Sequence, residues 1–129
     1  MRKLTKKETM GRNALWAQAL EQNRRRTEKR MRSRNGGRCC LCVATDLAIE
    51  QGWVNENKYD YGENKPNNLP SKAVAKAFGW FCTNPTLKDP QSECITAWAT
   101  DLNDQKHLAH KEIAKWVRHT FCESKGGKQ

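Results

Sequence analysis

A chain of 129 residues, of which 36% are hydrophobic, has room for one domain with a modest core. It contains no run of about 20 apolar residues, and no apolar stretch follows its first basic residues, so we expect neither a membrane span nor a signal peptide. The net charge of +10 implies a partner that carries negative charge.

The positive charge is concentrated in the first third of the chain. Residues 1–38 hold 13 of the 24 Lys and Arg residues and three acidic residues, whereas residues 39–129 hold 11 basic and 11 acidic residues. The rest of the chain is therefore electroneutral. A nucleic acid, a nucleotide or an acidic protein surface is expected to bind at the N-terminal region.

Residues 1–12 are expected to form a flexible basic tail, because only Leu4 offers an apolar anchor. A single globular domain is predicted over residues 13–122, followed by a polar tail over residues 123–129. Asn13 is the candidate N-cap of a short first helix. The apolar face of this helix would consist of Leu15, Trp16, Ala19 and Leu20.

A strongly basic segment follows the first helix. The eleven residues 24–34 contain seven basic residues, with Met31 as the one candidate for burial. Both an extension of the helix and a polar strand pair near residues 26–38 remain open. Lys and Arg side chains bind phosphates and carboxylates, so the candidate partner-binding residues are Arg24, Arg25, Arg26, Lys29, Arg30, Arg32, Arg34 and Arg38.

Residues 38–52 are predicted to contain the central core helix. Gly52 suits the left-handed position that ends a helix, and Trp53 and Val54 are expected to pack its exit. The apolar residues follow the i, i+3, i+4, i+7, i+8 spacing of a buried helix face: Cys40, Val43, Ala44, Leu47 and Ala48.

A long loop is predicted between residues 55 and 70, because Asn, Asp, Gly and Pro interrupt every period. Loops of this length are often functional. Tyr59 and Tyr61 are candidates to stack on a ligand, although rings that pin the loop to the body fit the pattern as well.

The remaining chain predicts three further short elements. Ser71 would cap a helix over residues 72–78 that ends at Gly79, and Trp80 and Phe81 are expected to be buried. Residues 82–90 would form a loop. A helix capped by Ser92 would end at residues 103–104, and a last helix would cover residues 110–121. The inward side chains of the helix after Ser92 would be Ile95, Trp98, Ala99 and Leu102.

These elements predict a mostly α fold of about five helices, with α+β also possible and any sheet limited to a short pair near residues 26–38. Several segments of the chain stand in a recognisable order: Trp16–Leu20, Gly37–Val43, Leu69-Pro70 with Gly79, Leu102-Asn103-Asp104, and Glu112-Ile113-Ala114. A family of small bacteriophage and prophage proteins carries similar segments in the same order, and Gly37–Val43 resembles its Gly-x-Cys-Cys-Leu-Gly-Val block.

The chain resembles this family over roughly residues 13–121, with two departures. Cys42 stands where the family pattern has Gly, and Ala109 stands where a capping Ser or Thr is expected before the last helix. The missing cap costs about 1 kcal/mol. The resemblance implies a phage setting, and with it the cytoplasm of a bacterial host, but no particular chemistry.

The six cysteines would be reduced in the cytoplasm, and we expect free thiols that are mostly buried. Cys40-x-Cys42 and His107-x-x-His110 could contribute to a zinc site, but thiols that act as small hydrophobes fit equally well. Cys39 or Cys40 at a helix start could act as a nucleophile with a His and Asn103 or Asp104, although an Asn-Asp pair is ordinary capping chemistry. The three His residues, His107, His110 and His119, are expected on solvated faces. We therefore predict no catalytic residue, metal or cofactor.

The function predicted from these observations is that of a non-enzymatic phage protein that binds a host component. It would act in host takeover or counter-defence, as an inhibitor that engages an acidic protein surface or a nucleotide signal through its basic segment. A nucleic-acid-binding accessory or regulatory protein is the first alternative, because basic segments bind phosphates without reading sequence. An enzyme with a Cys nucleophile is the second.

Overall fold

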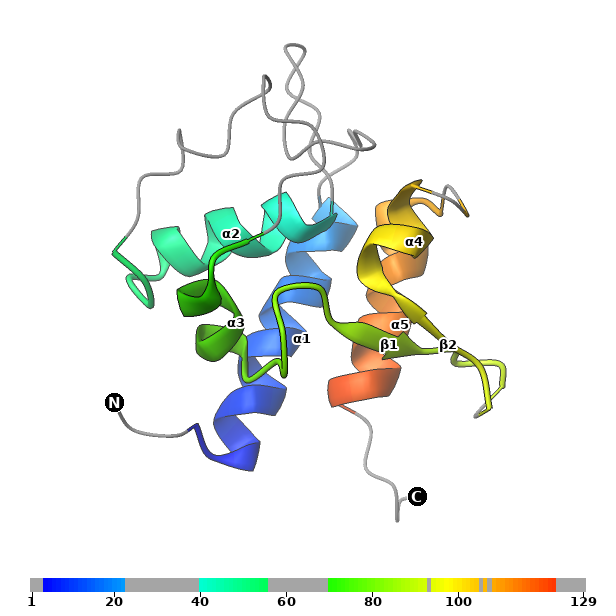
Figure 1. Cartoon of the computed structure of the whole chain (residues 1–129), viewed down its shortest axis with the longest axis horizontal. Coiled ribbons are helices and arrows are strands. Elements are labelled where there is room, and N and C mark those ends of the chain that lie inside the picture. Colours follow the sequence, from blue (N-terminus) through cyan, green and yellow to red (C-terminus); the bar gives the residue numbers. More distant parts are fainter. Residues whose placement is uncertain are drawn as a thin grey trace, which may run out of the picture.

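The fold is built from helices and one pair of short strands (Figure 1). The structure is a computed structural model that describes residues 4–22, 40–55, 70–92, 94–104, 106 and 108–122. Within these ranges the elements are α1 (Lys6–Gln22), α2 (Cys40–Glu50), α3 (Lys72–Phe78), β1 (Thr86–Lys88), β2 (Thr96–Trp98), α4 (Ala99–Asp104) and α5 (His110–Phe121). The predicted mostly α fold with one short β-pair is confirmed.

The two longest helices, α1 and α5, pack against each other and form the centre of the molecule (Figure 1). Helix α2 crosses the end of α1, and α3 lies beside α1 and α2. Strand β1 lies against α5, and β2 pairs with β1. The helices bury their apolar residues in one shared core, which includes Trp16, Leu20, Phe78, Ile113 and Val117. Burial of such side chains contributes about 1.5–3 kcal/mol each.

Helix α1 begins seven residues before Asn13, so the predicted start at Asn13 is wrong. Thr5 and Glu8 form a capping box, in which the Thr5 N–H donates to Glu8 Oε1 at 2.9 Å and the Glu8 N–H donates to Thr5 Oγ1 at 3.0 Å. Residues 6–12, which we predicted as part of a basic tail, form the first two turns of the helix. Within the predicted apolar face, Leu15 is 38% exposed and Ala17 is buried instead.

Asn13 is instead a buried residue in the middle of α1. Its amide Nδ2 donates to the carbonyl oxygens of Thr9 and Phe78, each at 2.8 Å, and its Oδ1 accepts from the indole Nε1 of Trp80 at 2.9 Å. Both ends of the amide are thus satisfied, as a buried polar group requires. The same bonds join α1 to the chain that follows α3.

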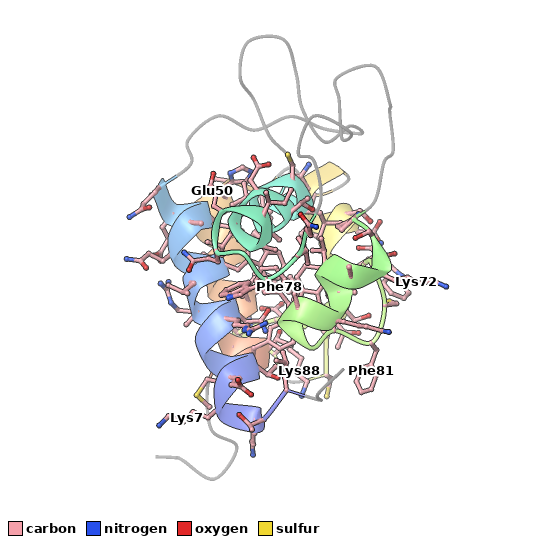
Figure 2. All side chains as sticks on the ribbon, turned by 90° about the vertical axis from the view of Figure 1, so that its left-hand side faces the viewer. Lys7, Glu50, Lys72, Phe78, Phe81 and Lys88 are labelled. Atoms are coloured by element: carbon pink, nitrogen blue, oxygen red, sulfur yellow. The ribbon has the colours of Figure 1, made fainter. Side chains whose placement is uncertain are left out.

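Four aromatic rings pack around this polar contact. Phe78 and Trp80 stack with ring centroids 4.9 Å apart, and Trp16 lies 4.9 Å from Trp80. Trp53 packs edge-on against Phe78 at 5.5 Å. These offset and edge-on arrangements are the ones that aromatic rings favour. Figure 2 shows Phe78 in the interior between α1, α2 and α3.

Helix α2 has the boundaries and the apolar face that its periodicity predicts, and it ends before Gly52, whose φ is +76°. Its burial is wider than a single stripe, because Leu41, Cys42 and Thr45 are also buried. The Thr45 hydroxyl donates to the Leu41 carbonyl at 2.9 Å, which satisfies it within the helix. A helix covered on nearly all sides confirms the predicted central position of this segment.

Helix α3 has both predicted caps. The Ser71 hydroxyl accepts from the Val74 N–H, and Gly79, with φ of +75°, ends the helix in the left-handed conformation. The Trp80 N–H then donates to the Ala75 carbonyl at 2.9 Å. Trp80 is buried as predicted, but Phe81 is fully exposed, so its predicted burial is wrong.

The predicted helix between Ser92 and Asp104 is correct only from Ala99 onward. Residues 96–98 form β2, which pairs antiparallel with β1 inside the predicted loop 82–90, in the register Leu87↔Ala97. Ile95 and Trp98 are each 48% exposed rather than inward. The β-pair therefore lies at 86–98, whereas residues 26–38, where we expected it, are outside the described part of the chain.

Backbone hydrogen bonds at both ends of this hairpin hold its register. The Asp89 N–H donates to the Ile95 carbonyl and the Ala99 N–H to the Pro85 carbonyl, both at 2.9 Å. On the other side of β1, the Lys88 N–H donates to the Thr120 hydroxyl of α5 at 2.7 Å. The hairpin is thereby attached to α5.

Helix α5 covers the predicted residues 110–121, with Ile113, Trp116 and Val117 buried. Ala109 occupies its N-cap position without a side-chain hydrogen bond, which confirms the missing cap. His110, which we expected on a solvated face, is buried. Among the described helices we find none with the length and apolar character that crossing a bilayer requires.

Candidate anion-binding site

The side chains predicted to bind an anionic partner lie outside the described residues. This holds for the basic residues Arg24, Arg25, Arg26, Lys29, Arg30, Arg32, Arg34 and Arg38 and for Tyr59 and Tyr61 of the predicted loop. The structure does describe the positions where the segments 23–39 and 56–69 join the helical body. The site is therefore built from those junctions.

The basic segment enters the body at Cys40, where three helices meet. The indole Nε1 of Trp16 in α1 donates to the Cys40 carbonyl at 3.0 Å. Asn103 of α4 accepts the Cys40 N–H through its Oδ1 at 3.3 Å, and the Cys40 thiol donates to the Ala99 carbonyl at 3.6 Å. Asn103 thus satisfies one of the N–H groups that the start of α2 leaves without a helical acceptor.

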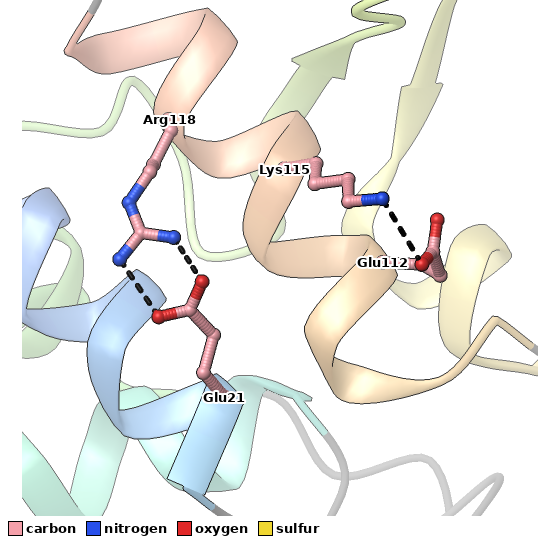
Figure 3. A network of polar contacts seen from close by, with 4 residues as sticks. All are labelled: Glu21, Glu112, Lys115 and Arg118. Carbon is pink, nitrogen blue, oxygen red and sulfur yellow. Dashed lines mark hydrogen bonds and ion pairs between the residues drawn. The ribbon is translucent and has the colours of Figure 1, made fainter.

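The segment leaves the body at the end of α1, next to an ion pair with α5 (Figure 3). The guanidinium of Arg118 donates two hydrogen bonds to the Glu21 carboxylate, one of them at 2.8 Å. These bonds lower the pKa of Glu21 and raise the pKa of Arg118. The last acidic side chain before the segment is therefore ionised and already bound within the body.

The segment is longer than its connecting role requires. The segment is joined to the body at Gln22 and at Cys40. Trp16 contacts Cys40 and lies six residues, or about 9 Å of helix, before Gln22, so the two junctions are on the order of 10–15 Å apart. Four or five extended residues would span this distance at about 3.3 Å each. The segment has 17 residues, with eight basic and one acidic.

The residues on either side of the segment 56–69 are also held in place by the body. Trp53, just before it, contacts Phe78, and the guanidinium of Arg12 lies 4.5 Å above the Trp53 ring while its Nη1 donates to the Ala77 carbonyl at 2.9 Å. Pro70, which follows this segment, is buried. Arg12 is thus a basic residue that stabilises the body through a cation–π contact and a hydrogen bond.

The cysteines and histidines have mixed surroundings. Cys40 and Cys42 are buried as predicted, and the Cys42 thiol lies 3.9 Å from Asp46 Oδ2. Cys82 and Cys94 are exposed, which contradicts the prediction that most thiols are buried. His119 is partly buried. Among the described residues, no three His, Cys, Asp or Glu side chains gather in a way that could hold a metal ion.

The exposure of Phe81 is a surface feature that the sequence pattern did not predict. Phe81 projects fully into solvent at the end of α3, on the side where Lys72 also points outward (Figure 2). Trp80 and Phe81 are adjacent and similarly apolar, so burial of both was a reasonable expectation. What distinguishes the two is the indole N–H of Trp80, which needs an acceptor when buried and finds it in Asn13, a contact that the sequence does not reveal.

Comparison with known proteins adds no relative. No family model, no curated protein and no solved structure matches this chain at a significant level. The resemblance to small phage proteins and the function drawn from it therefore stay predictions.

Proposed function

We propose that the protein is a non-enzymatic binding protein of a phage that engages an anionic host partner through residues 24–38. In this proposal it acts in the host cytoplasm as a host-takeover or counter-defence inhibitor. Its partner offers an acidic protein surface or a nucleotide to the arginines, whose planar guanidinium groups form paired hydrogen bonds with carboxylates and phosphates.

The proposal rests on how positive charge is distributed along the chain. Residues 39–129 are electroneutral, while the segment between α1 and α2 holds eight basic residues and one acidic residue. The nearest described acid, Glu21, is bound to Arg118 and does not compete for these bases. A concentrated positive charge of this kind attracts anions and accelerates their association.

A binding role is also supported by the surroundings of Cys40. Its thiol is buried and donates to the Ala99 carbonyl, and Asn103 caps α2. A reactive thiol needs an exposed, electropositive environment. Cys40 and Asn103, which the nucleophile hypothesis assigns to catalysis, thus serve in packing and in capping α2.

The experiment is capture of partners from phage-infected bacterial lysate by the tagged protein, with and without nuclease, followed by mass spectrometry and nucleic-acid staining. A discrete host protein that survives nuclease supports the inhibitor proposal. Nucleic acid that is lost on nuclease treatment or at moderate salt supports the alternative of a nucleic-acid-binding accessory protein.

The variant that tests the basic segment replaces Arg24, Arg25, Arg26 and Arg30 by Ala. Its matched control removes the same number of charges from the body, at the exposed residues Lys6, Lys106, Lys111 and Lys115. We expect the first variant to lose about four- to several-hundred-fold in capture, since four exposed charge contacts contribute about 0.2–1 kcal/mol each. Equal capture by the two variants would contradict the proposal.

A further inference from the structure

The end of α3 presents an aromatic ring to solvent. Phe81 is fully exposed, whereas the other exposed large apolar side chains of the described part, Leu15, Ile95 and Trp98, keep at least half of their surface covered. Burial of a Phe side chain contributes about 1.5–3 kcal/mol to stability, and Phe81 makes no such contribution because it is exposed. The ring therefore has both faces available to a partner.

The backbone on each side of Phe81 is held in place. The preceding residue, Trp80, is bound through its indole to Asn13 and through its N–H to Ala75. On the other side, the Cys82 thiol donates to the Asn84 carbonyl at 3.2 Å. The outward position of the ring follows from these contacts, because inward burial of Trp80 leaves its neighbour on the opposite side.

The exposed face of α3 adjoins this ring and carries only positive charge. Lys72 and Lys76 are exposed four residues apart on one side of the helix, with the exposed Ala73 between them, and α3 contains no acidic residue. Four residues of helix rise by about 6 Å. The exposed Gly79 then leads into Phe81. We call these five residues the α3–Phe81 surface.

We propose that the α3–Phe81 surface binds single-stranded nucleic acid, in addition to whatever residues 24–38 bind. Phe81 stacks on an unpaired base, and Lys72 and Lys76 contact phosphates of the same strand. Stacked nucleotides rise by about 3.4 Å each, so the two lysines match phosphates about two nucleotides apart. Proteins that bind single strands combine these same elements, aromatic stacking and a positive track for the backbone.

The composition of the surface favours nucleic acid over a protein partner. Lys and Ala are depleted in protein–protein interfaces, where Arg and Met accompany the aromatic residues. A single strand is favoured over a duplex, because the faces of paired bases are covered by their neighbours and cannot reach an exposed ring. The α3–Phe81 surface shares no residue with residues 24–38 and can be tested separately.

The test is fluorescence anisotropy at low salt with three labelled probes: an oligothymidylate of about twelve nucleotides, an abasic strand of the same length, and a duplex of the same length. We expect Phe81→Ala to weaken oligothymidylate binding by about five- to 100-fold and to leave the abasic strand unaffected. Phe81→Tyr keeps the ring and should retain wild-type affinity. Trp98→Ala, which removes another exposed aromatic ring, is the matched control.

The lysines are tested by Lys72→Ala with Lys76→Ala, with Lys111→Ala and Lys115→Ala as the control pair. The first pair should weaken binding of both the oligothymidylate and the abasic strand, and it should reduce the salt dependence.

The inference is overturned if Phe81→Ala binds oligothymidylate as wild type does, if it weakens both strands equally, or if the wild-type protein binds no single strand. The four-arginine variant separates the two proposals. Binding lost in that variant and kept in Phe81→Ala contradicts the α3–Phe81 surface but not the basic segment. Circular dichroism and a melting curve check that each variant is folded, which we expect because Phe81 buries no surface.

Discussion

Replacement of Asn13 by Ala should destabilise the protein more than any other single change of a polar side chain in α1. Asn13 is buried and joins α1 to the end of α3 through hydrogen bonds to Phe78 and Trp80. Sequence periodicity gives this residue no such importance, since Asn is common at surfaces and caps. The prediction therefore tests the contacts of the structure directly.

The magnitude follows from the groups that Ala would leave buried. The Trp80 indole N–H would lose its acceptor, and a buried donor without a partner costs about 1–3 kcal/mol. The Phe78 carbonyl would lose a donor at 2.8 Å, which adds about 1 kcal/mol. We expect a loss of about 2–4 kcal/mol in the free energy of unfolding, a large part of the total for a domain of this size.

The assay is urea unfolding followed by far-UV circular dichroism, which is insensitive to changes in tryptophan fluorescence. Gln18→Ala, an exposed substitution in the same helix, is the control and should change stability by less than about 0.5 kcal/mol. A double-mutant cycle with Trp80→Phe should give a coupling energy of about 0.5–3 kcal/mol. Stability of Asn13→Ala within about 0.5 kcal/mol of wild type, or zero coupling, would refute the reasoning.

Three further predictions concern helix ends and surface charge. Gly79→Ala should destabilise the protein by about 1–3 kcal/mol in urea unfolding, because the φ of Gly79 is +75° and the new Cβ would lie 2.7 Å from Thr9 Oγ1 in α1. Gly52→Ala, at a φ of +76° but with open space around the new Cβ, should cost about 1 kcal/mol. Equal losses of stability in the two variants would argue against the close approach at Gly79. Ala109→Ser should add the missing cap of α5, stabilise by about 0.5–1 kcal/mol and raise the melting temperature by about 2–5 °C, and an unchanged melting temperature would contradict the cap geometry. Because Arg118 lowers the pKa of Glu21 in the folded state, the pair stabilises above the usual carboxyl pKa of 4.5 and is lost as pH falls through the lowered value. Glu21→Gln should therefore cost up to about 1 kcal/mol at neutral pH and nothing in strong acid, measured by melting curves across pH.

Helices with strong local signals could be predicted from the sequence. The boundaries of α3 and α5 and the central helix α2 follow from apolar spacing and from Ser71, Gly79 and Gly52, because these signals act over a few residues. The start of α1 was predictable in principle, since Thr5 and Glu8 form a capping box in the sequence. Because Asn is a preferred N-cap residue, Asn13 was predicted as the start of the helix in place of Thr5.

The elements that depend on distant partners could not be predicted. Strands of three residues are too short to show alternation, and the hairpin is held by bonds such as Ala99 N–H to the Pro85 carbonyl. The exposure of Phe81 depends on the burial of its neighbour Trp80, whose indole N–H donates to Asn13, 67 residues away in sequence. The basic segment and Tyr59 and Tyr61 lie outside the described residues, so their role as a site stays a prediction.

The most direct test of the account is capture of the host partner by a chain in which the eight basic residues between Asn23 and Cys39 are replaced by Gln, at unchanged length. The measured quantity is the amount of partner recovered from infected lysate, relative to wild type, by protein with an unchanged melting temperature. The account predicts at least a tenfold loss, because the segment holds most of the charge that attracts the partner. Undiminished recovery would contradict it and place the binding surface elsewhere on the protein.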